Sequence, residues 1–279
     1  MSKLNLLNLV LFIVVISLAF FIYFSEEQSF DLDRVTDIDV NSITEIKIKH
    51  NKNITVIIKQ KNGKWQITQP VAIAANDFRI SSILKLINAP VHNKYALSEI
   101  NTSKLGLDGP TTSIQFNDGS TIYGISFGTT NPATNLRYIR LDDSVYTIED
   151  VYYPLISSHF GTLVSLNLLP DNNSTIEKLV LSSQTISKND NGLWQSNIDI
   201  DADDIIKTID HWQHAQAFGI HEYLKRDDLG EIFIYIKGQQ EPVTYSVTDT
   251  DPWLILARPE LGIEYHLDIE AYNNLVVPQ

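Results

Sequence analysis

The sequence contains no cysteine, a single methionine and no stripe of basic residues. Without cysteine there are no disulfides, thiolate zinc sites, iron–sulfur clusters or cysteine nucleophiles. The 21 Lys and Arg residues stand against 34 Asp and Glu, and the resulting net charge of −13 disfavours nucleic-acid binding because it repels phosphates. An apolar share of 43% excludes a disordered chain, and 279 residues are enough for one large domain or two small ones.

A long apolar run occupies residues 4–24, LNLLNLVLFIVVISLAFFIYF, and carries no charge. As a helix it would extend ~31 Å, close to the thickness of a bilayer's hydrocarbon core. Lys3 precedes the run and Glu26 and Glu27 follow it, so the positive-inside rule keeps the N-terminus cytoplasmic. The bulky residues that end the run make a poor signal-peptide cleavage site. The sequence therefore predicts a single-pass inner-membrane protein with most of its chain periplasmic or extracytoplasmic.

The rest of the chain alternates apolar and polar residues in short segments, which is typical of half-buried strands. Ile46 and Ile48 belong to one such segment, and Asn62-Gly63 is a strong hairpin signal before Trp65. A helix is predicted from Asn76 or Asp77 to the residue before Pro90. Antiparallel meanders joined by short helices predict an α+β fold.

The order of these segments recurs in the second half of the chain. The hairpin signal and the tryptophan after it recur at an offset of 129 residues, so that Asn62-Gly63 and Trp65 correspond to Asn191-Gly192 and Trp194. Tyr146 corresponds to Tyr265 at an offset of 119. We therefore predict two tandem, duplicated α+β lobes. The boundaries are a transmembrane anchor at 1–25, a linker at 26–42, a first lobe at 43–162, a link at 163–175 and a second lobe at 176–279.

Several short motifs of the first lobe resemble those of a known family. The motifs are Gly63-Lys-Trp-Gln-Ile-Thr-Gln-Pro70, Leu105-Gly-Leu-Asp-Gly-Pro110, Ile125-Ser-Phe-Gly128, Arg137-Tyr-Ile-Arg140 and Val145-Tyr146. In this order they look like the family catalogued as domain of unknown function 4340. The resemblance implies a bacterial envelope protein with one N-terminal anchor, in some members associated with ABC-type transport systems related to gliding motility. It implies no catalytic residue.

Two polar clusters are candidates for metal sites. His211 and His214 lie three residues apart on a predicted helix, with His221-Glu222 further on, but the histidine spacing of a zincin is missing. Asp199, Asp201, Asp203, Asp204 and Asp210 partly mimic a calcium loop, but Asp204 stands where that loop needs glycine. Helix capping explains the aspartates better. We predict no catalytic, cofactor-binding or metal site, and expect His211, His214, Asp199, Asp201 and Asp203 to be exposed.

The Gly-rich stretches at 106–110 and 127–131 are not followed by the Gly-Lys-Ser/Thr of a phosphate loop, so we interpret them as turns, with Gly106 ending a helix. Trp65, Trp194 and Trp253 are interpreted as core residues, although matched tryptophans also suit sugar stacking.

The sequence predicts a non-catalytic, membrane-anchored envelope protein that needs no cofactor. Its role would be that of an accessory or scaffold of a membrane complex of transport type, with a protein partner and no nucleic acid. The alternative is a module that binds a glycan or a lipid-linked sugar in a groove between the lobes. A hydrolase is the least favoured hypothesis. A polar pocket would favour a ligand, and a flat, exposed apolar patch would favour a protein partner.

Overall fold

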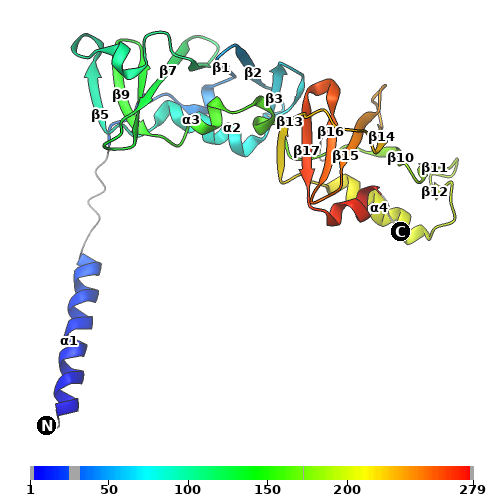
Figure 1. Ribbon diagram of the computed structural model, residues 1–279, viewed down its shortest axis with the longest axis horizontal. Coiled ribbons are helices and arrows are strands. Elements are labelled where there is room, and N and C mark those ends of the chain that lie inside the picture. The colour runs from blue at the N-terminus through cyan, green and yellow to red at the C-terminus, as the bar shows by residue number, and fades with distance from the viewer. Residues whose placement is uncertain (1–2, 25–31, 172, 277–279) are drawn as a thin grey trace. The chain divides into compact units, whose positions relative to one another are not determined.

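The computed structural model describes residues 3–24, 32–171 and 173–276, which fall into two units, Met1–Asp33 and Arg34–Gln279. The first unit contains helix α1 (Lys3–Phe24), whose side chains include the exposed Leu11, Phe12 and Ile13 (Figure 1). Among the helices of the described residues, none is both long and apolar enough to cross a bilayer. The transmembrane anchor predicted for residues 1–25 is therefore not supported.

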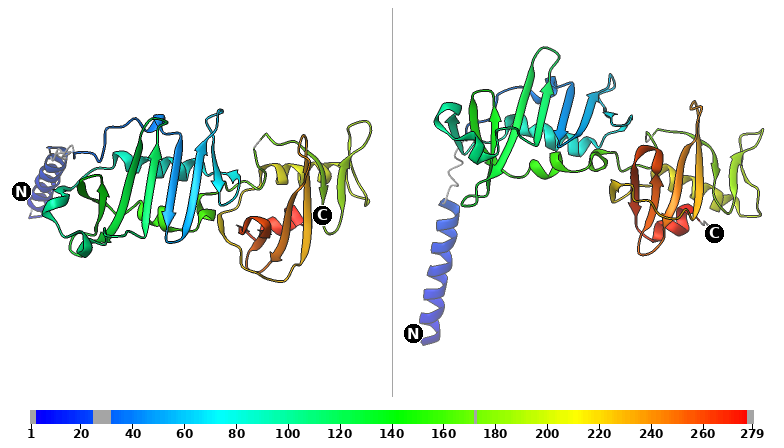
Figure 2. Two further views of the ribbon diagram at one scale, coloured as in Figure 1. Left: turned by 90° about the horizontal axis from the view of Figure 1, so that it is seen from above. Right: turned by 45° about the horizontal axis from the view of Figure 1, so that its top comes forward.

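The second unit contains two antiparallel sheets (Figures 1 and 2). The nine strands of the first sheet lie in the order β4-β3-β2-β1-β6-β7-β8-β9-β5. Their bounds are β1 Glu45–His50, β2 Asn53–Lys59, β3 Trp65–Gln69, β4 Ile73–Ala74, β5 Asn93–Ala96, β6 Thr112–Asn117, β7 Ile122–Thr130, β8 Leu136–Leu141 and β9 Ser144–Glu149. Helices α2 (Asp77–Leu84) and α3 (Tyr153–Ser157) cover one face of this sheet.

The second sheet has eight strands in the order β12-β11-β10-β14-β15-β16-β17-β13. Helix α4 (Ala202–His214) packs against it, and a π-helical turn at Tyr272–Val276 packs on α4. The strand bounds are β10 Ile176–Val180, β11 Thr185–Lys188, β12 Trp194–Ser196, β13 Gly219–Glu222, β14 Gly230–Ile236, β15 Val243–Asp249, β16 Leu254–Arg258 and β17 Ile263–Leu267. Short 3₁₀ turns lie at Val40–Ser42, Lys85–Asn88, Leu97–Glu99, Thr102–Leu105, Phe160–Leu163 and Pro259–Leu261.

The predicted α+β class with a transmembrane helix is wrong, because two large antiparallel sheets with few helices make up most of the fold. The physical reason lies in pairings between distant segments. Strand β1 pairs with β6 across the helix α2 region, so Lys47 lies opposite Gln115, and β10 pairs with β14 across α4. Each pairing merges two local meanders into one wide sheet, and local periodicity does not show such a merger.

The two sheets share one strand order. Strands β3-β2-β1-β6-β7-β8-β9-β5 of the first correspond in sequence to β12-β11-β10-β14-β15-β16-β17-β13 of the second, and only β4 is left over. Trp65 and Trp194 begin equivalent strands, and Tyr146 and Tyr265 are each the third residue of theirs. We call the first sheet with α2 and α3 the first lobe, and the second sheet with α4 the second lobe.

Residues before β1 belong to the first lobe rather than to a free linker. Val35 is buried, and its backbone N–H donates to the carbonyl of Ala89 at 3.0 Å. The hydroxyl of Thr36 donates to the carbonyl of Ile87 at 2.7 Å. Of the linker predicted at 26–42, residues 26–31 lie outside the described residues, and the segment from Arg34 on packs against the first lobe.

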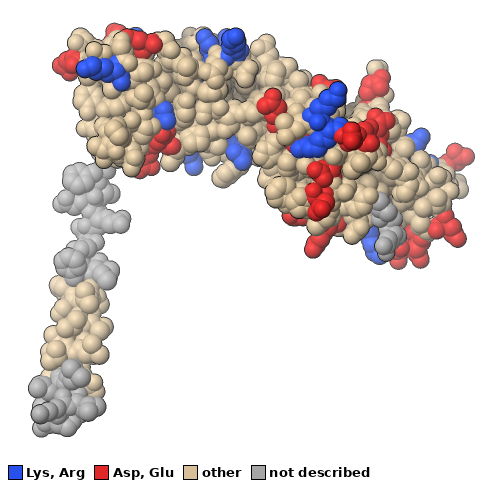
Figure 3. All heavy atoms as spheres, viewed as in Figure 1, with Lys and Arg blue, Asp and Glu red and all other residues tan. Residues whose placement is uncertain are grey.

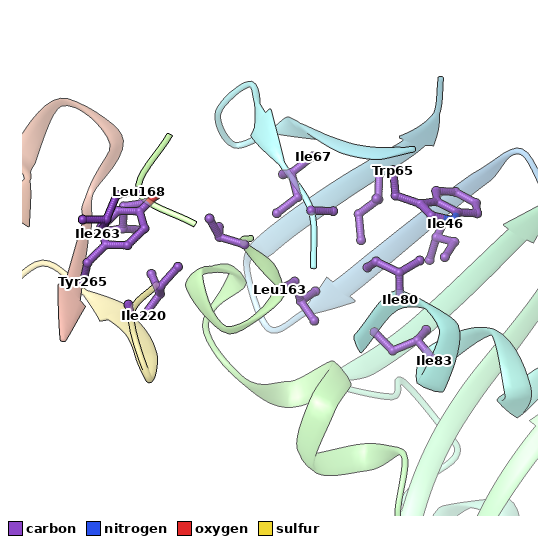
Figure 4. Close-up of a cluster of buried hydrophobic side chains, with 14 of the residues drawn as sticks. Ile46, Trp65, Ile67, Ile80, Ile83, Leu163, Leu168, Ile220, Ile263 and Tyr265 are labelled. Atoms are coloured by element: carbon purple, nitrogen blue, oxygen red, sulfur yellow. The ribbon is translucent and has the colours of Figure 1, made fainter. Parts of the chain in front are cut away.

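The link between the lobes is held by both of them. Leu163 packs with Ile80 and Ile83 of α2, whereas Leu168 packs beside Tyr265 (Figure 4). The backbone N–H of Ser165 donates to the carbonyl of Ala74 at 2.9 Å. On the other side, the Tyr245 hydroxyl donates to the carbonyl of Leu168 at 2.5 Å. The link is thus a fixed structural element, which allows it to form part of a site.

Local capping follows the sequence closely. The side chain of Asn76 accepts from the N–H of Arg79 at 3.1 Å at the start of α2. Asp201 caps α4 by accepting from the N–H of Asp203 at 3.0 Å. Gly106 ends a 3₁₀ turn with φ = 68°, a left-handed conformation that glycine adopts without strain. The capping interpretation of Asn76, Asp201 and Gly106 is confirmed.

Gly128 on β7 permits a close approach of two backbone segments. A Cβ atom at this position would clash with the carbonyl oxygen of Leu105 and lie 3.1 Å from the side chain of Leu107. We expect Gly128→Ala to lower the free energy of unfolding by about 2 kcal/mol, as measured by urea denaturation, because backbone must move to admit the methyl group. Gly124→Ala in the same strand is the control, because nothing lies within 4 Å of its Cβ position. Equal effects of the two substitutions would contradict the explanation.

Candidate functional site

The residues that the sequence suggested as metal ligands lie at the surface. His211, His214, Asp199, Asp201 and Asp203 are all exposed. His214 lies 3.2 Å from Asp210 in an exposed pair on α4, and Asp201 serves as the helix cap. Within the described part of the chain, no group of three or more His, Asp or Glu side chains is arranged to hold a metal ion.

A groove of about 720 Å³ lies within the second unit, where the first lobe, the link and the second lobe meet. Ligand pockets typically measure ~300–1,000 Å³. The hairpin between β2 and β3 forms one wall, the hairpin between β14 and β15 forms the other, and the link contributes residues 165, 167–171 and 173. The lining residues are Gln60, Asn62, Lys64, Trp65, Gln66, Ala72, Ile73, Ala74, Ala75, Asp77, Ser165, Asn167, Leu168, Leu169, Pro170, Asp171, Asn173, Gln239, Glu241, Pro242, Val243, Arg258 and Tyr265.

Residues with amide side chains, from all three parts of the chain, line the groove. Each primary amide offers both donors and an acceptor, which matches a ligand hydroxyl because a hydroxyl also donates and accepts. Two of these amides are already oriented by the protein. Asn62 accepts from the N–H of Lys64 at 3.0 Å, and Asn167 accepts from Gln216 at 2.8 Å. The amide residues of the lining are Gln60, Asn62, Gln66, Asn167, Asn173 and Gln239.

Both cations that line the groove are paired within their own lobe. Lys64 lies 3.1 Å from Asp77, and Arg258 lies 2.9 Å from Glu260. Burial raises the pKa of Tyr265 to about 12, although Arg258 opposes the shift, so the phenol stays neutral near pH 7. The groove therefore presents amide groups and the carboxylates of Asp171 and Glu241 beside partly exposed apolar surface from Ile73 and Pro242. This chemistry suits a hydroxyl-bearing ligand better than an anionic one.

A second polar cluster lies in the second lobe, around a buried carboxylate. The Glu264 side chain on β17 is 1% exposed and accepts bonds from Arg226 at 2.6 and 3.2 Å, and from the N–H of Leu224 at 3.0 Å. Nε2 of His266 lies 2.8 Å from the same carboxylate. Burial raises the pKa of Glu264, but the bonds from Arg226, Leu224 and His266 together lower it more, so the net shift is downward.

This cluster is not visible in the sequence, because the bonds to Glu264 from Leu224 and Arg226 join residues about 40 positions apart. Its members give no motif, and alternation along β17 places Glu264 on what looks like a solvent face. The groove residues were also missed individually, although a groove between the lobes was one of the predicted ligand sites. Trp253, predicted for the core, is 47% exposed because it lies just before β16 rather than within it.

Acid should weaken the fold through His159. Burial lowers the pKa of this imidazole, with Glu222 opposing the shift, and its Nδ1 accepts from the N–H of Gly161 at 3.2 Å. The unfolded chain therefore binds this proton more readily, so stability is present above pH ~6.5 and is lost as pH falls through the folded pKa. We expect His159→Asn, which keeps an acceptor but does not titrate, to reduce the loss of stability between pH 7 and 5. Urea denaturation at each pH measures it, and an unchanged profile would contradict the assignment.

Comparison with family models matches residues 65–229 to the family described as Domain of unknown function (DUF4340). The match begins at Trp65 on β3 and ends at Leu229, so it covers most of the first lobe, the link, α4 and the first strands of the second lobe. No curated protein and no solved structure matches the chain.

Proposed function

Because the chain belongs to the family described as Domain of unknown function (DUF4340), a membership that assigns it no reaction, we propose its function from the groove itself. The protein is a non-catalytic binding module that holds a hydroxylated ligand of the glycan class between its lobes. The observation that carries this proposal is the presence of six amide-bearing residues in the lining of one groove of about 720 Å³.

Energetic considerations favour several weak contacts over one strong anchor. A neutral hydrogen bond contributes about 1 kcal/mol net, so a sugar that engages three or four amides gains affinity mainly from their number. The partly exposed apolar surface of Ile73 and Pro242 suits the C–H faces of a sugar ring. The paired cations Lys64 and Arg258 leave no unbalanced positive charge to select an anionic ligand.

The test is a calorimetric titration of the protein with three soluble tetrasaccharides: chitotetraose, maltotetraose and xylotetraose. We expect at least one to bind, and Gln66→Ala and Gln239→Ala each to weaken that binding about fivefold, the equivalent of about 1 kcal/mol. Gln195→Ala is the matched control. Gln195 occupies the position of Gln66 in the repeated hairpin, follows Trp194 as Gln66 follows Trp65, and does not line the groove.

Binding that persists unchanged in both groove variants would overturn the proposal, as would a failure of all three sugars to bind at millimolar concentration. The role of accessory or scaffold in a membrane complex, with an envelope location, stays a prediction.

A further inference from the structure

A cluster of aromatic and imidazole rings lies on the face of the second sheet that α4 does not cover. We define the aromatic patch as Phe218, Trp253, His221 and His266. The ring centroids of Phe218 and Trp253 are 5.6 Å apart in an edge-on arrangement, and each lies 6.2 Å from His266. The rings of His221 and His266 are 4.6 Å apart.

The strand register explains how the two imidazoles of the patch share one face. Along β17, Ile263, Tyr265 and Leu267 are buried on the helix side, so His266 points to the opposite side. His266 lies opposite Gly219 on β13. The His221 ring occupies the space beside Gly219, where a Cβ atom would lie 3.1 Å from its Nε2. The missing side chain at Gly219 thus leaves room for both imidazoles.

Two large aromatic side chains of the patch remain open to solvent. Phe218 is 51% exposed and Trp253 is 47% exposed, even though they pack against each other. Nearby Leu224, whose N–H bonds to Glu264, is 57% exposed. Aromatic side chains are enriched in the centres of protein interfaces, where they supply large contact areas. A contiguous exposed cluster of this kind indicates an interaction site, whereas single apolar residues scattered over a surface do not.

The charge around the patch limits what that partner is. Residues 176–279 contain 18 Asp and Glu against 7 Lys and Arg, so this part of the chain carries −11 of the total charge of −13. Figure 3 shows acidic side chains gathered over the second lobe. Asp251 precedes Trp253 by two residues and is exposed, whereas Glu222, paired with Ile263, lies on the sheet face opposite His221. Arg226, whose partner Glu264 also contacts His266, is neutralised by its two bonds to that carboxylate.

We propose that the aromatic patch binds a basic segment of a partner protein, one that combines Arg or Lys with apolar side chains. A guanidinium or ammonium group packs over the exposed faces of Trp253 and Phe218, and its charge is balanced by Asp251 and by the excess of carboxylates in the second lobe. Apolar neighbours in the segment cover Leu224. Anionic lipid surfaces and nucleic acids are repelled by the same carboxylates. The site shares no residue with the groove, so this inference and the proposed function fail or succeed separately.

The test uses fluorescence anisotropy of a labelled peptide of four Arg-Leu repeats, titrated with the full chain at low salt. We expect binding that weakens about fivefold or more in Trp253→Ala and in Phe218→Ala, in line with a cation–π contact of about 1 kcal/mol. We also expect Asp251→Asn to weaken binding. The control is Phe78→Ala, which removes an 80% exposed phenylalanine from α2 in the first lobe.

Three outcomes would overturn the proposal. The first is no binding of the Arg-Leu peptide at millimolar concentration. The second is binding that Trp253→Ala and Phe218→Ala leave unchanged, or that Phe78→Ala weakens equally. The third is equal or tighter binding of a Glu-Leu peptide or of vesicles that contain phosphatidylglycerol. Trp253→Gln and Phe218→Ser serve as second variants if an alanine variant fails to fold, with far-UV circular dichroism as the check.

Discussion

Glu264→Ala is expected to lower the free energy of unfolding by about 3 kcal/mol. The substitution removes a carboxylate that is 1% exposed and leaves Arg226, the N–H of Leu224 and His266 without their acceptor. Removal of one partner from a buried ion pair typically costs 3–5 kcal/mol, and the lower end applies because Arg226 is 26% exposed and regains water.

Glu260→Ala is the matched control for this experiment, because Glu260 also binds an arginine but is 51% exposed. An exposed pair contributes at most about 1 kcal/mol. Urea denaturation of both variants at pH 7 measures the free energy of unfolding. Equal decreases in the two variants would show that the buried carboxylate stabilises the fold no more than the exposed one.

The sign of the pH effect at Glu264 follows from its lowered pKa. Its stabilisation is fully present above the unfolded value of about 4.5 and is lost as pH falls through the folded pKa. Glu264→Gln should therefore flatten the acid limb of the stability profile below pH ~4.5. A variant whose acid limb matches that of the parent chain would contradict this assignment.

Trp212→Ala is expected to cost about 3–5 kcal/mol and to lower the thermal midpoint by about 10 °C. The indole is fully buried, packs 6.2 Å from the ring of Tyr245, and donates from its N–H to the carbonyl of Leu275 at 3.0 Å. The substitution leaves a cavity and an unpaired carbonyl. The turn at Tyr272–Val276 should then exchange its amide hydrogens faster, because it loses its bond to α4.

Trp253→Ala provides the same chemical change at a 47% exposed site, where we expect a loss below about 0.5 kcal/mol. Calorimetry on the two variants separates burial from residue type. If they unfold at the same temperature, the burial argument for Trp212 fails.

Local signals in the sequence located many of the structural elements. Alternation at Ile46 and Ile48 predicted strand β1, and Asn62-Gly63 predicted the hairpin that leads into β3. The polar residues Asn76 and Asp201 cap helices as expected. These features depend on neighbours within a few residues, and the chemistry of those neighbours is visible in the sequence.

Features that depend on distant contacts were not predicted. The pairing of β1 with β6 joins residues about 70 positions apart. Without this pairing, the strands of the first sheet look like two separate meanders. Glu264 appeared to be an ordinary surface acid, because the segment around Leu224 and Arg226 that covers it arrives from about 40 residues away. Trp253 appeared to be a core residue, because the sequence does not show that its strand begins one residue later.

The shared strand order makes the contact between the lobes heterologous. The first lobe contributes Trp65 on β3, whereas the second contributes Val243, Arg258 and Tyr265 on β15, β16 and β17. The counterparts of these surfaces are β12 in the second lobe and β7, β8 and β9 in the first, and they are not used in the groove. A two-fold arrangement would have closed on itself. The two halves of the contact are therefore not interchangeable, because β4 contributes Ile73 and Ala74 to the groove and the second sheet has no strand equivalent to β4.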